Sequence, residues 1–563
     1  MERPMTRRTV LRAGAAGAVA LALAGADPTR AFAQAGGDGD GNGDNGDNGG
    51  DDHRDHDDAI TERSIASLHK ALREGEMTSV ELVTAYLERI AALDRAGPTV
   101  NSIIELNPDA LEIAAALDKE RRKHGSRSLL HGIPIVVKDN IATADKMETT
   151  AGSLALVGAK VPADATLITN LRRAGAIVLA KTNLSEWANF RSFTSNSGWS
   201  GRGGLTANPY LLTHNPCGSS SGSGAAASAS FAAAAVGTET DGSVTCPASI
   251  CGIVGLKPTH GLVSGNGIVP LAHSQDTAGP MGRTVSDVAA LLAAMTGEPA
   301  NRYTSKLRKG SLRGTRIGVA RQFFGRLVDD PNDPAVLADP VALRTAPVWE
   351  AAIAALRDAG AVVVDPIAVA DADKYGGTEL TVLLYEFKAD LNAYLASLVS
   401  SPVRTLADVI AFNTANASTE LQFFDQSIMD AAEATTGLTT QKYLDALAND
   451  VTTSRAGLDA AFTKDQLDAI VYPTTGPAWE TFLGKGDIFD TIGFTSAPAV
   501  SGYPHVTVPA GFDGVLPMGF SIVGPAGSDA RILSYAYAFE QNTKARRAPT
   551  FLTSAATPAS AAV

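Results

Sequence analysis

Hydrophobic residues repeat at helical spacing in three parts of the chain. Between residues 64 and 95 they fall on one side of a helix, and Ser79 predicts the start of a second helix within this stretch. Residues 375–465 are also predicted to be mainly helical and are interpreted as an insertion on the substrate side. The pattern from about 529 to 544 predicts a long amphipathic helix. The apolar side of the first stretch comprises Leu68, Leu72, Leu82, Ala85, Tyr86 and Ile90.

Short apolar runs elsewhere in the chain predict buried strands. Residues 134–137 read Pro-Ile-Val-Val and end at the polar Lys138, as a buried strand that runs into a loop does. Residues 171–178 and 356–363 share one order of features, namely a helix end, a glycine and then a hydrophobic strand. Helices alternating with strands predict a layered α/β fold. Further strands are expected at 316–320, 468–473, 505–509 and 518–524.

Composition and charge narrow the class of protein. Of the 563 residues 45% are hydrophobic, which is enough for a large core. The formal charge of −13 and a pI near 5.2 argue against a nucleic-acid partner, because binding to phosphates needs clustered Lys and Arg. No apolar run reaches the roughly 18 residues of a membrane span. The three cysteines are too few for a disulfide framework.

The first 33 residues predict an export signal. The paired Arg7 and Arg8 precede an uncharged stretch of 14 residues at 13–26, and Ala31-Phe32-Ala33 offers a cleavage site before Gln34. The arginine pair resembles a twin-arginine signal, so the mature protein is expected to be secreted or periplasmic. The alternative, a short membrane anchor, is opposed by the length of the stretch and by the cleavage site.

Residues 34–58 predict a disordered linker, since residues 35–58 are almost all Gly, Asp, Asn and His and bury nothing. Residues 38–43 match the first half of an EF-hand loop, but its twelfth position is Gly49 and the bidentate Glu is missing. Weak metal binding by this linker stays open. No Pro/Ser-rich linker interrupts 60–555, so 59–555 is predicted to be one domain, followed by a flexible tail at 556–563.

A run rich in glycine and serine at 218–224 has three interpretations. A flexible linker has this composition, but strongly apolar sequence flanks the run. A nucleophile elbow, G-x-S-x-G, would place the nucleophile at Ser220. The elbow needs a preceding strand, which 212–216 does not resemble, and a downstream acid and histidine. The available histidines are His260, His273 and His505, and none has a context that singles it out.

The third interpretation is a resemblance to a known family. The text I-V-V-K-D-N around Lys138, the run at Ser219, and G-T-E-T-D-G-S-V followed by C-G-I-V-G-L-K-P-T resemble the amidase signature family. The match is dense over about 130–290 and continues at 469–479 and 501–511. Within the family, P-C-G-S-S-S-G-S and S-Q-D-T-A-G-P-M look most like bacterial peptide amidases. The resemblance implies a large mixed β-sheet of about a dozen strands with helices on both faces.

The same resemblance implies a catalytic set. Ser243 corresponds to the nucleophile, Ser219 to a bridging serine that follows a cis peptide bond, and Lys138 to the base. A serine hydroxyl needs a base within hydrogen-bond reach, and a lysine serves only when burial keeps it neutral. Taken alone, a lysine at a strand end is more often a surface residue. The implied oxyanion hole comprises Thr240, Asp241, Gly242 and Ser243, with the Asp241 side chain unassigned.

The implied activity is hydrolysis of a carboxamide to a carboxylate and ammonia through an acyl-enzyme, without a cofactor. C-terminally amidated peptides are the expected substrates. Aryl acylamidase and cyclic-amide hydrolase are alternatives within the family, and an esterase using Ser220 is an alternative outside it. The tRNA-dependent amidotransferase subunit is disfavoured, because an exported acidic protein does not meet charged tRNA.

Weaker candidates lie near the motifs. Trp187, Phe190 and Trp199 are candidates for a substrate pocket, although aromatic residues in such loops are more often core. Cys217 lies close to Ser219 but is interpreted as a small buried cysteine, because no histidine context activates it. Cys246 and Cys251 are too isolated for a zinc site, and the chain shows no phosphate loop, dinucleotide motif or metal-ligand cluster.

Overall fold

The computed structural model describes residues 59–328 and 338–554. The predicted export signal at 1–33, the linker at 34–58 and the tail at 556–563 lie outside the described residues and stay predictions. No described helix is both long enough and apolar enough to cross a bilayer.

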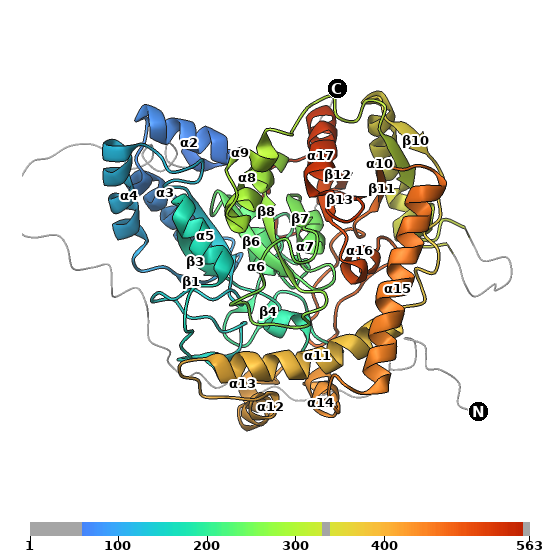
Figure 1. Cartoon of the computed structure of the whole chain (residues 1–563). Helices are drawn as coiled ribbons and strands as arrows, with labels where there is room; N and C mark the ends of the chain where they lie inside the picture. The colour runs from blue at the N-terminus through green and yellow to red at the C-terminus, as the bar shows by residue number, and fades with distance from the viewer. Residues whose placement is uncertain (1–58, 329–337, 555–563) are drawn as a thin grey trace, which may run out of the picture. The chain divides into compact units, whose positions relative to one another are not determined.

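One large mixed sheet organises the described chain, as the resemblance implied (Figure 1). It has eleven strands, and every strand expected from the apolar runs is present in it. Parallel pairing joins β2 to β3 and β6, and joins β9 to β10 and β11, while the other neighbours are antiparallel. In spatial order the strands are β1 (Ile103–Leu106), β3 (Ile177–Thr182), β2 (Pro134–Lys138), β6 (Ala234–Glu239), β8 (Thr277–Gly282), β7 (Val254–Lys257), β12 (His505–Asp513), β13 (Leu516–Val523), β11 (Ala469–Pro473), β9 (Arg316–Val319) and β10 (Val362–Val364).

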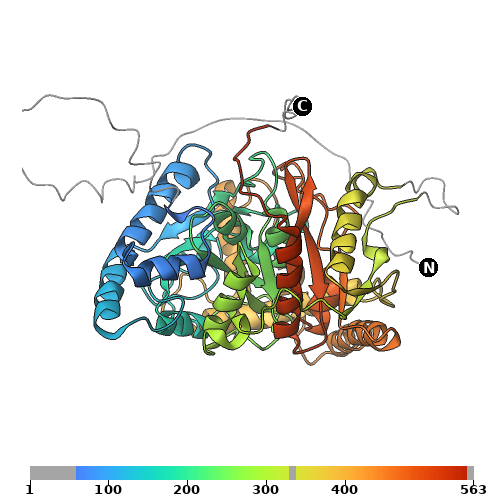
Figure 2. The ribbon, with the colours of Figure 1, turned by 90° about the horizontal axis from the view of Figure 1, so that it is seen from above.

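Helices that are far apart in sequence pack next to one another along the sheet (Figure 2). Helices α5 (Thr166–Ala174), α8 (Val285–Thr296), α17 (Asp529–Thr543) and α10 (Pro340–Asp358) lie side by side and contact strands from β3 to β12. Two short helices, α6 (Ser221–Ser228) and α7 (Thr245–Ile250), contact each other and the central strands. All eight residues of α6 are buried, so the Ser/Gly-rich segment is a core helix and the flexible-linker interpretation is wrong.

The N-terminal helical stretch divides where the sequence predicts. Helix α2 (Ile65–Glu74) ends at Gly75, and α3 (Ser79–Arg89) begins at Ser79 behind a capping box between Thr78 and Glu81. A π-helical turn at Ile90–Arg95 continues it, and α4 (Ala110–His124) packs against α3. The predicted change from helix to strand at 171–178 is also confirmed, since Gly175 caps α5 in the left-handed region at φ 87° before β3.

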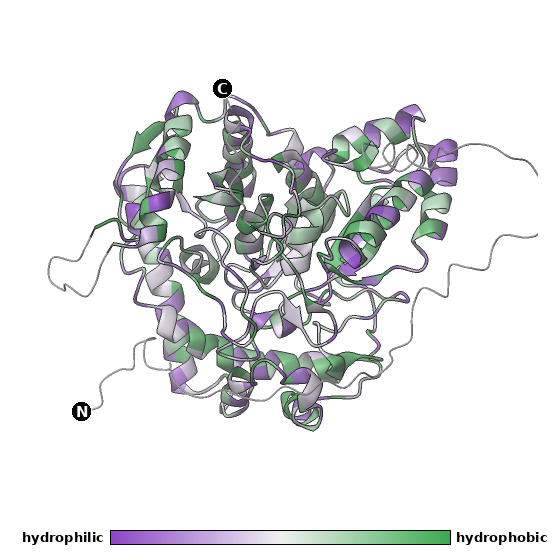
Figure 3. Cartoon of the chain, turned by 180° about the vertical axis from the view of Figure 1, so that it is seen from behind, coloured by the Kyte–Doolittle hydropathy of each residue, from purple (hydrophilic) through white to green (hydrophobic). Residues whose placement is uncertain are grey.

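Residues 375–465 are mainly helical, as predicted. Several of these helices enclose a second apolar cluster with Trp187 and Phe190, separate from the core beside the large sheet. Hydrophilic and hydrophobic residues are mixed along the helices in Figure 3, as expected where one side packs and the other meets solvent. The helices are α11 (Gly376–Ser397), α12 (Leu406–Ala415), α13 (Ala417–Glu420), α14 (Ser427–Glu433) and α15 (Gln441–Lys464).

Candidate active site

The candidate site forms where β2 and β6 end. These strands are parallel neighbours, so their carboxyl ends meet at one edge of the sheet. Lys138 is the last residue of β2, and the segment that carries Ser243 follows β6. The turn before α6 places Ser219 between them. The Lys138 Nζ donates to the Ser219 Oγ at 2.7 Å, and the backbone N–H of Ser220 donates to the Ser243 carbonyl at 3.1 Å. All three sequence-predicted residues are thus brought together.

Lys138 is fully buried, and burial is what a neutral lysine requires. Besides Ser219, its Nζ donates to the Oγ1 of Thr238 at 2.8 Å and to the carbonyl of Thr238 at 3.2 Å. Burial lowers the pKa of Lys138 to about 7, although the nearby carboxylates of Asp276 and Glu239 act in the opposite direction. A substantial fraction of Lys138 is therefore neutral near pH 7.

Ser219 sits in a tightly packed turn. The peptide bond between Gly218 and Ser219 is cis, as the resemblance implied, and the Ser219 side chain is fully buried. The Ser219 carbonyl accepts from the backbone N–H of Ser185 at 3.0 Å. A Cβ at Gly218 would lie 2.1 Å from the Ser185 Oγ, so only glycine fits here.

Hydrogen bonds join the two ends of the loop that carries Ser243. The Glu239 carboxylate accepts from the backbone N–H groups of Val244 at 2.7 Å and Thr245 at 2.8 Å, which anchors the start of α7. Gly242 is in the left-handed region at φ 75°, and the Ser243 side chain keeps a small exposed fraction. Within 59–328 and 338–554, the backbone N–H groups of Asp241, Gly242 and Ser243 have no protein acceptor. These donors remain available to an oxygen at the site.

The Asp241 side chain, which the sequence left unassigned, is hydrogen-bonded to a side chain outside its own loop. Its Oδ2 accepts from the Ser496 Oγ at 2.6 Å, at the start of α16 (Ser496–Ser501). Glu379 on α11 lies nearby, and burial together with the Asp241 charge raises the pKa of Glu379 well above its usual value. Asp241 is thus tied to two elements of the surrounding fold, α16 and α11.

Thr238 and Asp276 also contact the site, although no motif assigned them a role. Asp276 accepts from the Thr240 Oγ1 at 2.6 Å and from the backbone N–H of Leu271 at 2.7 Å, which links it to the Ser243 loop. Asp276 belongs to the S-Q-D-T-A-G-P-M text, so the motif signalled it without revealing its contacts. The three residues before it bond one helix: His273 bonds Asp390, Ser274 bonds Glu386, and Gln275 bonds Glu379, all on α11.

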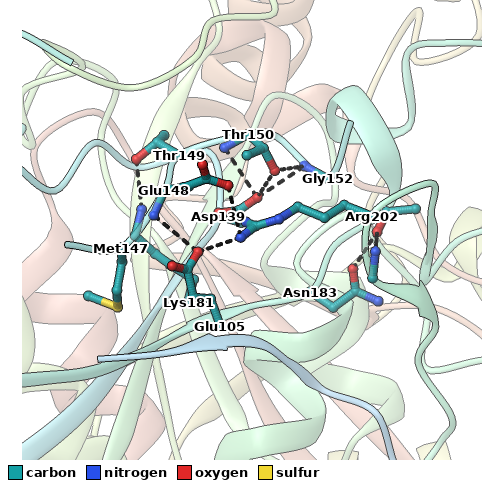
Figure 4. A network of polar contacts seen from close by, with 12 residues as sticks. Glu105, Asp139, Met147, Glu148, Thr149, Thr150, Gly152, Lys181, Asn183 and Arg202 are labelled. Atoms are coloured by element: carbon teal, nitrogen blue, oxygen red, sulfur yellow. Dashed lines mark hydrogen bonds and ion pairs between the residues drawn. The ribbon is translucent and has the colours of Figure 1, made fainter. Parts of the chain in front are cut away.

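A second polar network fixes the residues that follow Lys138 (Figure 4). The Asp139 carboxylate accepts from Thr150 and from the backbone N–H of Gly152 at 3.2 Å, and its other oxygen lies 3.6 Å from an Nη of Arg202. The buried Lys181 donates to the carbonyl of Ile141 at 2.7 Å, and burial lowers its pKa to about 8. This network holds the chain at the end of β2 in one place.

Ser220 is placed as a structural residue. Its Oγ donates to the Thr238 carbonyl and accepts from the Thr238 N–H, both at 3.1 Å, so its hydrogen-bonding capacity is used by β6. None of the three candidate histidines contacts it: His260 bonds the His273 carbonyl, His273 bonds Asp390, and His505 bonds Ser521. The geometry required for a nucleophile elbow is absent around Ser220.

The three aromatic pocket candidates belong to packed clusters. Trp187 and Phe190 are buried in the second apolar cluster, where Phe190 contacts Phe387 edge to face. Trp199 is buried beneath Phe424 and the guanidinium of Arg191. Their positions agree with the alternative interpretation, that these residues are core aromatics.

The structure changes the interpretation of two cysteines. Cys217 and Cys246 form a disulfide, with Cα atoms 6.0 Å apart and a separation of 29 residues in sequence. Cys217 is buried as expected, but it is not a free thiol. A count of three cysteines excludes a framework of several bridges, yet it says nothing of one pair that the fold brings together. The bridge joins the segments that carry Ser219 and Ser243. Cys251 is free and buried.

A cavity of about 230 Å³ adjoins Lys138 through Thr238. Its lining includes Asn140, Thr240, Asp276, His273 and Asp390. The only potential metal ligands that cluster in the described residues are His273, Glu386 and Asp390, whose ligand atoms lie within 4.8 Å of one another. Both carboxylates already accept hydrogen bonds, from Tyr443 and Ser274 on Glu386 and from His273 on Asp390. Each carboxylate therefore has hydrogen-bond partners within the protein.

Comparison with known proteins decides the family. The profile of the Amidase family matches residues 81–533. The chain is 39% identical over 516 residues to a probable amidase from Arabidopsis thaliana, covering 88% of this chain and 92% of that protein. The chain belongs to the amidase family. As the sequence resemblance implied, it is an amide-hydrolysing enzyme.

Two further amidase-family relatives bear on the subgroup. The crystal structure of native peptide amidase from Stenotrophomonas maltophilia is 47% identical, with a TM-score of 0.80, and the match covers 87% of this chain and 99% of that one. A glutamyl-tRNA(Gln) amidotransferase subunit from Microcystis aeruginosa is 35% identical over 510 residues, which cover 87% of this chain and 99% of that protein. The predicted likeness to bacterial peptide amidases is confirmed.

Proposed function

We propose that the chain hydrolyses C-terminal peptide amides to a peptide carboxylate and ammonia, with Ser243, Ser219 and Lys138 as its catalytic residues. One observation carries the proposal: a fully buried lysine, with its pKa lowered to about 7, bonds the hydroxyl of Ser219 at 2.7 Å. Such a lysine is neutral often enough to accept a proton at physiological pH.

The acylation step uses the two serines in series. The Ser243 Oγ forms a bond to the amide carbon while its proton moves to Ser219 and the Ser219 proton moves to Lys138. The N–H groups of Asp241, Gly242 and Ser243 then donate to the oxyanion, as an oxyanion hole requires. Thr240 is the fourth residue of the implied oxyanion hole. Its Oγ1 donates to Asp276, and this bond holds Thr240 in the loop.

Collapse of the intermediate returns the proton. Lys138 gives its proton back through Ser219 to the departing nitrogen, the C–N bond breaks and ammonia leaves. Water then attacks the acyl carbon while one of its protons moves through Ser219 to Lys138. That proton returns through Ser219 to the Ser243 Oγ as the acyl–oxygen bond breaks, and the product acid releases its remaining proton to solvent as the carboxylate. The enzyme returns to its starting protonation state without a cofactor.

The substrate class rests on similarity. A peptide amidase is 47% identical, whereas the amidotransferase subunit is 35% identical, and the excess of acidic residues gives no support to binding of tRNA. We expect purified protein to release ammonia from peptide amides at a kcat/KM at least tenfold above that for anilides and cyclic amides. Assays of ammonia for peptide amides, of aniline for anilides and of the newly formed amine for cyclic amides measure this on one substrate panel. A preference for anilides or cyclic amides would assign one of the alternative activities instead.

We also propose that the chain is exported through a twin-arginine-type signal at residues 1–33. The disulfide supports this, because disulfides persist mainly in oxidising compartments. N-terminal sequencing of the exported protein should begin near Gln34, and thiol alkylation before reduction should leave Cys217 and Cys246 unlabelled. Replacing Arg7 and Arg8 by lysine should retain precursor in the cytoplasm; normal export of that variant would remove the twin-arginine assignment.

A further inference from the structure

Five large apolar side chains are exposed in three segments that meet on the surface. Phe193, Phe423, Phe482, Ile488 and Phe489 have exposed fractions of 36–60%. We call these five residues the aromatic patch. Single exposed apolar residues are normal on protein surfaces, whereas a contiguous group marks a site of interaction.

Hydrogen bonds and close packing join the three segments. Asn196, three residues after Phe193, donates to the Gly486 carbonyl at 2.9 Å and accepts from the Gly484 N–H at 2.7 Å. A Cβ at Gly484 would lie 2.7 Å from the Phe423 carbonyl oxygen, so this loop also lies directly on the third segment. The three segments that carry the aromatic patch are therefore neighbours in space.

Packed side chains connect the aromatic patch with the segments that carry Ser219 and Ser243. Phe489 packs edge to face on Trp479, with ring centroids 4.8 Å apart, and Trp479 packs on the cluster that contains the disulfide. That disulfide links the segments of Ser219 and Ser243. Beside it, Asp487 accepts from the N–H and the Oγ of Ser197 at 2.9 and 2.6 Å, and Ser197 lies against Gly218. The loop of the aromatic patch is thus anchored on the turn that precedes Ser219.

We propose that the aromatic patch binds apolar side chains of the substrate peptide on the N-terminal side of its amide. The inference rests on the proposed function, because ammonia is then the whole leaving group and every substrate side chain lies on the acyl side. The acyl part of an extended peptide extends away from Ser243, and the loop of the aromatic patch is anchored on the turn before Ser219. Burial of apolar area on both partners favours peptides with bulky apolar residues.

Three acetylated amides that share a C-terminal alanine amide test the inference. The probes are acetyl-Ala-amide, acetyl-Phe-Leu-Phe-Ala-amide and acetyl-Ser-Asn-Ser-Ala-amide. We expect kcat/KM for the apolar tetrapeptide to exceed that for the polar one by about tenfold or more, since each partly buried ring adds a few-fold. The double variant Phe482→Ser/Phe489→Ser should lose most of this advantage, with the loss confined to the apolar peptide. Leu111→Ser serves as the control, because it replaces an exposed apolar residue by serine on α4, outside the aromatic patch.

The outcomes separate the two proposals. If acetyl-Ala-amide and both tetrapeptides release no ammonia, the proposed function fails and the inference fails with it. If the amides are hydrolysed but the apolar peptide has no advantage, or the double variant keeps that advantage, only the role of the aromatic patch is overturned. An unchanged preference together with loss of a dimer in sedimentation would assign the aromatic patch to contacts between copies of the chain. Circular dichroism and the kcat for acetyl-Ala-amide verify that the variants fold.

Discussion

Ser243→Ala should reduce amide hydrolysis by about a thousandfold or more, because removal of the nucleophile leaves only binding and the oxyanion donors. The fold should persist, since the Ser243 hydroxyl makes no hydrogen bond with the described residues and its side chain is small. Initial rates of ammonia release and circular dichroism measure the two effects.

Ser220→Ala is the matched control, one residue from Ser219 in the same turn. Its hydroxyl bonds only the backbone of Thr238, so we expect the loss of activity to stay within about tenfold, or roughly 1.4 kcal/mol of barrier. A serine-reactive phosphonate should label Ser243 in the wild type and in Ser220→Ala, as peptide mapping would reveal. A label on Ser220 would overturn the nucleophile assignment and restore the elbow.

Activity should rise with pH as Lys138 loses its proton, with a midpoint near 7. The sign follows from the mechanism: only the neutral amine accepts the Ser219 proton, and burial lowers the pKa from its usual 10.5 to about 7. The pH dependence of kcat/KM for a substrate without titrating groups measures this limb. A midpoint near 10 would mean that burial does not keep the lysine neutral.

Lys138→Arg and Lys138→Ala should be about equally inactive on amides. Arginine keeps the positive charge but does not deprotonate at any usable pH, so it cannot replace a base. A purely electrostatic lysine predicts the opposite order, with the arginine variant active and the alanine variant inactive. Because a guanidinium is larger than the ammonium it replaces in this buried site, circular dichroism must first verify that both variants fold. Activity of folded Lys138→Arg within about tenfold of wild type contradicts the assignment of Lys138 as the base.

Local patterns were sufficient to predict most of the elements. The apolar run before Lys138 and the helix-glycine-strand order around Gly175 depend on neighbours in sequence, and both formed as predicted. The large mixed sheet came from the family resemblance, since the strand order joins β8 to β6 and β12 to β7 across long stretches of chain. Such crossovers leave no periodic trace in the sequence.

The sequence by itself, through its ordered motifs, singled out Lys138, Ser219 and Ser243 as candidate catalytic residues. It did not determine the burial of Lys138, since a lysine at a strand end is more often a surface residue. Tertiary structure decided how they are supported. The bond of Lys138 to Thr238 spans 100 residues, and the bridge between Cys217 and Cys246 depends on α7 returning to the turn before Ser219. Trp187, Phe190 and Trp199 joined packed clusters because the distant segment 375–465 covers them. These outcomes depend on which distant segments share a boundary, and hydrophobic pattern records burial but not the partner against which a residue is buried.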